Sequence, residues 1–289
     1  RDLFAQAGVD PARVHGVADL KALPVVSRQM YREFTDAVVR RDPERYASYY
    51  QDATSGSSGM PVRFYRTWDE RAYMIAKFLR VLFACGYRFS DTTLWIPAPN
   101  SAGPASWLQR LGIMPRHVIP FSEPTEKLVE AYVRIRPDIL YANKSHLVQM
   151  ALHVRERGIE IRRPRLYVSA GEVLDGVSAQ VLHSVFGRDN LVDAYGALEC
   201  SSIAFRGPGA GCFRVNHDTD IVEIVDPDPA HANIGACVIT DLHIHSFPLI
   251  RYRLGDRLEL EDRRGDLPVI RRVIGRQDGR GEGGGDVVP

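Results

Sequence analysis

Apolar and polar positions follow two different spacings along the middle of the chain. Between residues 118 and 195, short runs rich in Val, Ile and Tyr alternate with longer segments whose apolar residues recur every three or four positions. The first spacing is typical of buried strands and the second of amphipathic helices. The predicted strands are 118–121, 138–142, 165–168 and 191–195, and the predicted helices are 124–136, 145–157 and 175–186. This alternation predicts β-α-β units with a parallel sheet, and therefore an α/β fold.

The segments before residue 118 are less regular. Residues 1–47 have the pattern of helices and connections, and residues 93–97 that of a buried strand. Thr67 and Glu70 have the spacing of a capping box, in which each residue caps the other at a helix start. The helix predicted after them carries an apolar stripe and ends at Gly86, so we interpret the stripe as core.

The pattern changes again after residue 205. Short strands separated by turn residues are predicted at 221–225, 236–240, 248–252 and 257–260, which favours a small antiparallel, barrel-like subdomain. We therefore expect an α/β core over residues 1–205, an antiparallel subdomain over 206–275, and a hinge leading into a further domain over 276–289. The glycine-rich stretch 279–286 has the composition of a linker.

The bulk composition narrows the classes of partner. The 289 residues carry a net charge of +1, which does not indicate a nucleic-acid or membrane surface. The sequence shows no long apolar run and no signal peptide, so a cytoplasmic protein is expected. The chain starts at Arg1 without methionine, which indicates a piece of a longer protein. Homodimer formation is left open.

Four cysteines occur, at positions 85, 200, 212 and 237, and none forms a C-x-x-C pair. Reduced, free thiols are the favoured interpretation. The alternative is a zinc site made by Cys200, Cys212, His217 and Cys237, whose spacing is irregular.

The chemistry starts from one loop. Its residues are Thr54, Ser55, Gly56, Ser57, Ser58 and Gly59, and a strand-like run follows at 62–65. Glycines let backbone N–H groups approach an anion, and hydroxyls add further donors, so this composition suits a polyphosphate. The loop is not a Walker A loop, because Met60 and Pro61 stand where Lys and Ser or Thr would follow. A plain flexible connection is the alternative interpretation.

Three polar segments also follow predicted parallel strands. They are 143–145, 169–172 and 195–199. Ligands of open α/β sheets bind at the carboxyl ends of the strands, so we expect these segments to meet at one binding edge.

Five motifs stand in a fixed order: T-S-G-S-S-G from Thr54, S-A-G-E from Ser169, Y-G-A-L-E from Tyr195, R-Y-R-L-G-D from Arg251 and G-R-Q-D from Gly275. This series resembles the adenylate-forming superfamily of acyl-CoA ligases, adenylation domains and luciferases, and in particular its phenylacetate–CoA ligase-like branch. The resemblance implies the large N-terminal domain of such an enzyme. It also implies ATP and Mg²⁺ as cofactors, a carboxylic acid, with an aromatic one favoured, as the substrate, and CoA as the expected acceptor.

The same resemblance assigns roles to individual residues. Glu199 would bind Mg²⁺, Asp256 both ribose hydroxyls, and Arg276 would act with Glu199 as a catalytic residue at the hinge motif that includes Asp278. Tyr195 would lie against adenine. The other nucleotide contacts would come from the Ser/Gly loop and from Ser169, Ala170, Gly171, Glu172, Gly196 and Ala197. The acid would contact Tyr141, Asn143, Lys144, Ser145 and Ala170.

Each role has an alternative. Glu199 could be a solvated residue at a helix start, Tyr195 a core residue, Asp256 a turn cap, and Lys144 a solvent-facing side chain. Arg251 and Arg253 would orient the site by pairing with carboxylates.

The chain departs from the superfamily pattern at three places. Leu198 replaces a Ser or Thr, Met60 replaces a frequent Lys, and the catalytic lysine of the C-terminal domain is not in the sequence. Transfer to an amine or a carrier protein, activation of an unusual oxyanion, and a non-catalytic nucleotide-binding relative are therefore the alternative functions.

Overall fold

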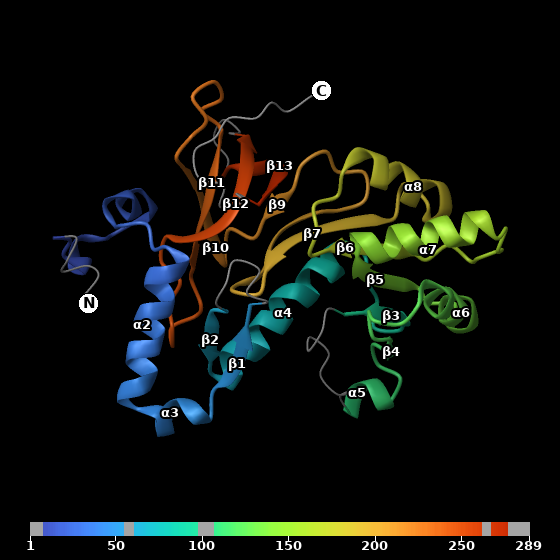
Figure 1. Ribbon diagram of the computed structural model, residues 1–289, viewed down its shortest axis with the longest axis horizontal. Helices are drawn as coiled ribbons and strands as arrows, with labels where there is room; N and C mark the ends of the chain where they lie inside the picture. Colours follow the sequence, from blue (N-terminus) through green and yellow to red (C-terminus); the bar gives the residue numbers. More distant parts are fainter. Residues whose placement is uncertain (1–7, 55–60, 98–106, 262–266, 277–289) are drawn as a thin grey trace. The chain divides into compact units, whose positions relative to one another are not determined.

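The computed structural model describes residues 8–54, 61–97, 107–261 and 267–276 (Figure 1). The chain divides into two compact units. The first contains residues 1–72, 217–268 and 272–289, and the second contains residues 73–216 and 269–271. The break at 216–217 lies close to the predicted boundary at 205–206. Residues 1–72, however, group with the antiparallel part of the chain rather than with the α/β core.

The second unit is built on a seven-stranded sheet in the order β4-β3-β5-β6-β7-β8-β9. The first five strands are parallel, and β8 and β9 add an antiparallel edge. The strands are β3 (Thr93–Ile96), β4 (Arg116–Val118), β5 (Ile139–Asn143), β6 (Leu166–Ala170), β7 (Leu191–Ala197), β8 (Ser201–Arg206) and β9 (Arg214–Val215). The predicted α/β fold with a parallel sheet is confirmed.

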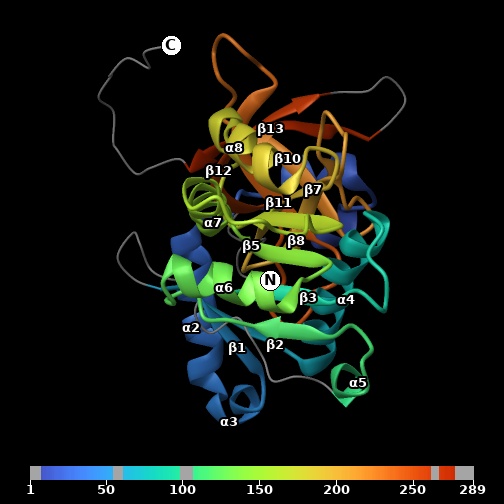
Figure 2. The same cartoon turned by 90° about the vertical axis from the view of Figure 1, so that its right-hand side faces the viewer.

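Helices cover both faces of this sheet. One apolar core joins the sheet to α6 (Thr125–Ile135), α7 (Lys144–Glu156) and α8 (Gly176–Phe186). Figure 2 shows these helices along one side of the strands. The second core joins the other face to α4 (Trp68–Ala84). The stripe predicted as core is therefore core. A short helix, α5 (Trp107–Arg110), precedes β4.

The first unit contains a hairpin and a second sheet. Strands β1 (Tyr50–Ala53) and β2 (Arg63–Arg66) pair antiparallel, so the Ser/Gly loop connects two paired strands. The second sheet has the order β10-β11-β12-β13, with antiparallel pairing from β10 to β12. Its strands are β10 (Asp220–Val225), β11 (Ile234–Asp241), β12 (Tyr252–Glu261) and β13 (Val269–Arg276).

Two strand predictions need correction. Residues 248–251 are not a strand, because Arg251 has a φ of +47° and β12 starts only at Tyr252. The predicted strand 118–121 lies three residues earlier, at Arg116–Val118.

The N-terminal residues are helical, as predicted. They form η1 (Pro11–Arg13), η2 (Val17–Ala22), α2 (Arg28–Arg41) and α3 (Pro43–Ala47). The capping box is also present, since Glu70 N donates to Thr67 Oγ1 and Thr67 N donates to Glu70 Oε2.

Among the described residues, no helix is both long and apolar enough to cross a membrane.

Candidate functional site

Three predicted site segments end neighbouring strands of the second unit. Asn143 on β5 pairs with Ala170 on β6, and Ala170 pairs with Ala194 on β7. These strands are parallel, so their carboxyl ends lie at the same edge of the sheet. The prediction that the three segments meet at one edge is confirmed.

Ion pairs and hydrogen bonds connect the first two segments. Glu172 Oε2 accepts hydrogen bonds from the backbone N and the hydroxyl of Ser145, at the start of α7. Lys144 Nζ lies 3.3 Å from Asp175 Oδ2. Asp175 caps α8, and hydrogen bonds from Ser178 hold the pKa of its carboxyl well below the usual range. The predicted substrate residues Lys144 and Ser145 thus help to join α7 to the loop after β6.

Strand alternation decides which side chains of this edge face which helices. Ser169 is completely buried and points to the side of Tyr167, whose ring packs in the core of α6–α8. Ala170 points to the opposite side, the side of Val168, which packs against α4. Tyr195 is 9% exposed, so its ring is mostly covered by protein.

Gly196 lies where β7 and β8 approach each other closely. The pairing register shifts between Tyr195 and Gly196, and a Cβ at position 196 would lie 2.3 Å from the carbonyl oxygen of Ser201. Such a contact is shorter than van der Waals separation allows, so any side chain would push β8 away. The glycine of this motif therefore has a packing role in addition to its predicted nucleotide contact.

Gly196→Ala is expected to lower the free energy of unfolding by about 3 kcal/mol, because β8 must shift to admit the methyl group. Urea denaturation measures this change. Gly176→Ala is the matched control, since nothing lies within 4 Å of a Cβ at Gly176 and its φ is negative. The control is expected to be neutral or slightly stabilising. Equal stability of the two variants would contradict the close approach at Gly196.

Glu199 lies in the tight turn that joins β7 to β8. The turn is closed by a hydrogen bond from Cys200 N to Ala197 O of 3.2 Å, and Glu199 is only 5% exposed. The alternative of a solvated glutamate at a helix start is therefore wrong. Within the described ranges, no cluster of three or more His, Cys, Asp or Glu side chains could hold a metal. This suits Mg²⁺, which usually takes one or two carboxylates together with phosphate oxygens.

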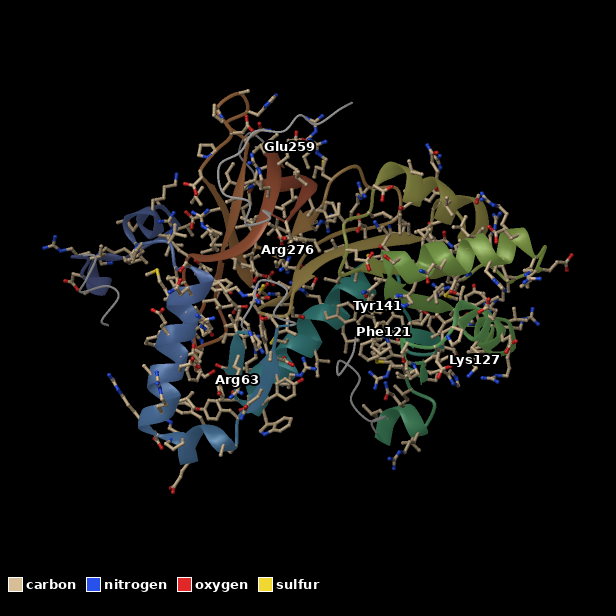
Figure 3. All side chains as sticks on the ribbon, viewed as in Figure 1. Arg63, Phe121, Lys127, Tyr141, Glu259 and Arg276 are labelled. Carbon is tan, nitrogen blue, oxygen red and sulfur yellow. The ribbon has the colours of Figure 1, made fainter. Side chains whose placement is uncertain are left out.

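Tyr141 belongs to an aromatic group on the α4 side of the sheet. Its ring meets Phe78 of α4 edge-on, with ring centroids 5.4 Å apart, and Trp95 of β3 at 5.9 Å (Figure 3). Burial raises the pKa of Tyr141 to about 12, so the hydroxyl stays protonated and can donate a hydrogen bond.

Asp193 is a buried acid that the sequence analysis did not single out. It precedes Tyr195 on β7 and lies 2.7 Å from Arg206 on β8, whose guanidinium also lies over the ring of Phe213. Burial raises the pKa of Asp193 from 3.8 to about 6, against the opposing effect of Arg206.

The carboxyl group of Asp193 is expected to titrate near pH 6. Its folded pKa exceeds its unfolded pKa, so its contribution to stability is complete below about pH 4 and is lost as the pH rises to 6. Relative to Asp193→Asn, the wild-type free energy of unfolding should fall by roughly 2–3 kcal/mol between pH 4 and pH 7. Carboxyl carbon NMR and urea denaturation at both pH values measure these effects. A midpoint at or below pH 4 would contradict the assignment.

In the first unit, Thr54 closes the base of the Ser/Gly loop. Thr54 N donates to Val62 O at 3.1 Å, and Val62 N donates to Thr54 Oγ1 at 3.0 Å. The same hydroxyl accepts a hydrogen bond from Arg28 Nη2, in the first turn of α2. The predicted residues Ser55, Gly56, Ser57, Ser58 and Gly59 lie outside the described residues, as does Asp278.

Asp256 and Arg276 come together on neighbouring strands. Asp256 Oδ1 of β12 lies 3.6 Å from Arg276 Nε of β13, which is labelled in Figure 3. Asp256 follows Gly255, whose φ is +89°. The structure thus brings these two predicted site residues within ion-pair distance in the first unit.

The two arginines of the same motif pair with carboxylates, as predicted. Arg253 lies 2.6 Å from Asp226, and Arg251 lies 3.2 Å from Glu223. Arg251 also donates to the carbonyl oxygens of Lys21 and Leu23, so it fastens the N-terminal segment to the sheet.

The four cysteines are free: Cys200 and Cys237 are buried, and Cys85 and Cys212 are partly buried.

Sequence reasoning missed Arg28, Lys77 and Asp193. Arg28 follows the capping Ser27, and Lys77 and Asp193 lie on apolar segments. A charged residue on the buried stripe of a helix or strand is itself a signal, because charges are rarely buried without a partner.

Two curated relatives match the chain in sequence. It is 25% identical over 282 residues to a phenylacetate–coenzyme A ligase of Thermus thermophilus, which covers 89% of this chain and 60% of the relative. It is also 25% identical to a phenylacetate–coenzyme A ligase of Pseudomonas putida, over 98% of this chain and 66% of that protein. The chain therefore spans about two thirds or less of their length. No protein-family profile matches it.

Solved structures share the fold. A 2-hydroxyisobutyryl-CoA ligase in complex with its acyl-AMP and CoA matches with a TM-score of 0.76 and 18% identity, over 96% of this chain and 65% of the ligase. An anthranilate–CoA ligase in complex with anthranoyl-AMP matches with a TM-score of 0.58 and 18% identity, over 79% of this chain and 47% of that one. These likenesses confirm the predicted fold class.

Proposed function

We propose, from the premise that this chain has the fold of the adenylate-forming superfamily and matches its phenylacetate–CoA ligases in sequence, that it is the large domain of an ATP-dependent acid–CoA ligase. In the first half-reaction, a carboxylate oxygen attacks the α-phosphorus of ATP. The bond to the β-phosphate breaks, pyrophosphate leaves, and an acyl-AMP forms. Transfer of the acyl group to CoA follows and releases AMP.

The observation that carries this proposal is the position of Glu199. A buried carboxylate in a turn just beyond a parallel strand is placed at the edge where α/β sheets bind ligands. We propose that this carboxylate holds Mg²⁺. When bound, Mg²⁺ would neutralise charge on the phosphate oxygens and orient them for displacement.

The neighbouring residues in the second unit would hold the base and the acid. Tyr195 would lie against adenine, with the backbone of Ser169, Ala170 and Gly171 nearby. Gly171 has a φ of +77°, so a side chain there would strain the backbone. Tyr141 would contact the acyl group through its protonated hydroxyl or its ring, which favours an aromatic acid.

The residues of the first unit would hold the ribose and the phosphates. The Asp256 carboxylate would accept hydrogen bonds from both ribose hydroxyls, and Arg276 would orient that carboxylate. Thr54 would contribute its hydroxyl to the phosphate loop. Because Met60 stands where relatives carry Lys, we propose that Arg28, which already contacts Thr54, supplies positive charge at the base of this loop.

Transfer of the acyl group to an amine or a carrier protein is the second candidate within this class. It rests on the same adenylation chemistry. A non-catalytic nucleotide-binding relative is favoured by Leu198 and Met60 and is disfavoured by the buried Glu199.

Exchange of labelled pyrophosphate into ATP tests the proposal with the full-length protein. The assay uses a panel of aryl and aliphatic acids, with and without Mg²⁺. Exchange that requires both Mg²⁺ and one class of acid supports adenylation and identifies the substrate class. Tight ATP binding without exchange for any acid would overturn the proposal in favour of the non-catalytic alternative.

A further inference from the structure

Lys77 is a buried cation on the face of α4 that packs in the second unit. The residue is only 3% exposed, and its ammonium donates a 2.8 Å hydrogen bond to the backbone carbonyl of Cys200. The two residues lie 123 positions apart in the sequence. Lysine is among the residues least often buried, because an ammonium loses its hydration when it leaves water. An apolar residue would satisfy the helix stripe at lower cost, so the ammonium has a specific reason to be there.

The hydrogen bond ends on the turn that carries Glu199. Cys200 is the next residue after Glu199, and Ser201 follows with a φ of +62°. Ser201 Oγ donates a second hydrogen bond to α4, to the carbonyl of Met74 at 3.1 Å. Met74 and Lys77 are three residues apart and therefore lie on the same side of the helix. Two successive turn residues are thus fastened to one face of α4.

The charges on this turn are complementary. Glu199 is 5% exposed and Lys77 is 3% exposed, so a carboxylate and an ammonium are both withdrawn from water around the same turn. A buried carboxylate tends to take up a proton unless an opposite charge keeps it ionised. Only the ionised form can bind a metal cation strongly.

We propose that Lys77 is a positioning residue for the metal-binding carboxylate. Its ammonium fixes the turn through the Cys200 carbonyl and keeps Glu199 ionised in the metal-free protein, so that the carboxylate is ready to receive Mg²⁺ with ATP. This inference rests on the proposed function, because it takes Glu199 as the Mg²⁺ ligand. Lys77 acts through Glu199 and does not itself contact the reacting atoms.

A purely structural role makes a different prediction. If the ammonium only supported the β7–β8 turn, its loss would change stability but would leave the effect of Mg²⁺ on ATP binding unchanged. The distinguishing quantity is therefore the ratio of ATP affinities measured with and without Mg²⁺, which does not depend on turnover.

Lys77→Gln tests the proposal, because glutamine keeps a donor for the Cys200 carbonyl and removes the charge. Calorimetric titration of the full-length protein with ATP, with and without Mg²⁺, is expected to show a fall of about tenfold or more in the Mg²⁺ enhancement. ATP affinity without Mg²⁺ should change less than about twofold. Lys77→Arg, which keeps the charge, should retain most of the enhancement. Ser201→Ala, the matched control, removes the other bond to α4 without a charge change and should change the enhancement less than about threefold.

The outcomes separate the two proposals. A wild-type enhancement that Lys77→Gln leaves unchanged would overturn this inference and leave the proposed function standing. A wild-type protein that binds ATP equally with and without Mg²⁺ would overturn the metal role of Glu199 and this inference together. Should Lys77→Gln not fold, Lys77→Met, an apolar replacement of similar length, carries the same test.

Discussion

Glu199→Gln is expected to lower Mg²⁺-dependent pyrophosphate exchange by about a thousandfold, because a metal that stabilises charge on phosphate oxygens contributes several kcal/mol to the reaction. Glutamine has nearly the same shape but carries no negative charge, and it is a poor ligand for Mg²⁺. The fold should survive, since removing a buried charge from a tight turn reduces the cost of its desolvation.

The measurement compares exchange rates over a range of Mg²⁺ concentrations, with urea denaturation as the check on folding. Glu160→Gln is the matched control, because Glu160 is an exposed glutamate of the same unit and its loss of charge should leave exchange unchanged. Near-normal exchange by Glu199→Gln at every Mg²⁺ concentration would mean that the metal is held by other residues.

Asp256→Ala is expected to weaken ATP binding by about ten- to a hundredfold, because it removes the acceptor for two ribose hydroxyls. Hydrogen bonds to an ionised acceptor contribute more than neutral ones, about 1.5–3 kcal/mol. Asp256→Asn keeps one acceptor oxygen and should lie between the alanine variant and the wild type. Calorimetric titration with ATP measures all three proteins.

The ligand offers an independent check of this assignment. Wild-type protein should bind 2′-deoxy-ATP more weakly than ATP, whereas Asp256→Ala should distinguish the two much less. Glu259→Gln is the matched control, since Glu259 lies on the same strand and pairs with an arginine of β13, Arg272, at 3.2 Å. Equal loss of ATP affinity in the control would show that β12 responds to any change of charge, and would remove the ribose assignment.

Local sequence pattern predicted the elements of the α/β unit well. The helices at Thr125–Ile135, Lys144–Glu156 and Gly176–Phe186 and the three strands beside them each differ from the prediction by at most two residues at either end. These elements are amphipathic or fully buried, so the information that specifies them lies within each segment. The resemblance to the superfamily had the same local basis, because each motif is short and contiguous.

The pairing of distant segments could not be read in that way. The β8 and β9 edge and the irregular residues 248–251 depend on which backbone groups find partners elsewhere. Arg251 adopts a positive φ while its guanidinium reaches Glu223 and the N-terminal carbonyls, a combination that only the folded chain stabilises.

The sequence by itself determined the α/β class, the order of the motifs, and the residue types that suit an adenylating enzyme. The tertiary structure decided how those residues are held. It placed Glu199 in a buried turn, turned the Ser169 side chain into the core of α6–α8, and brought Lys77 to the Cys200 carbonyl. The physical reason is that burial and charge pairing are properties of surroundings assembled from residues more than a hundred positions apart.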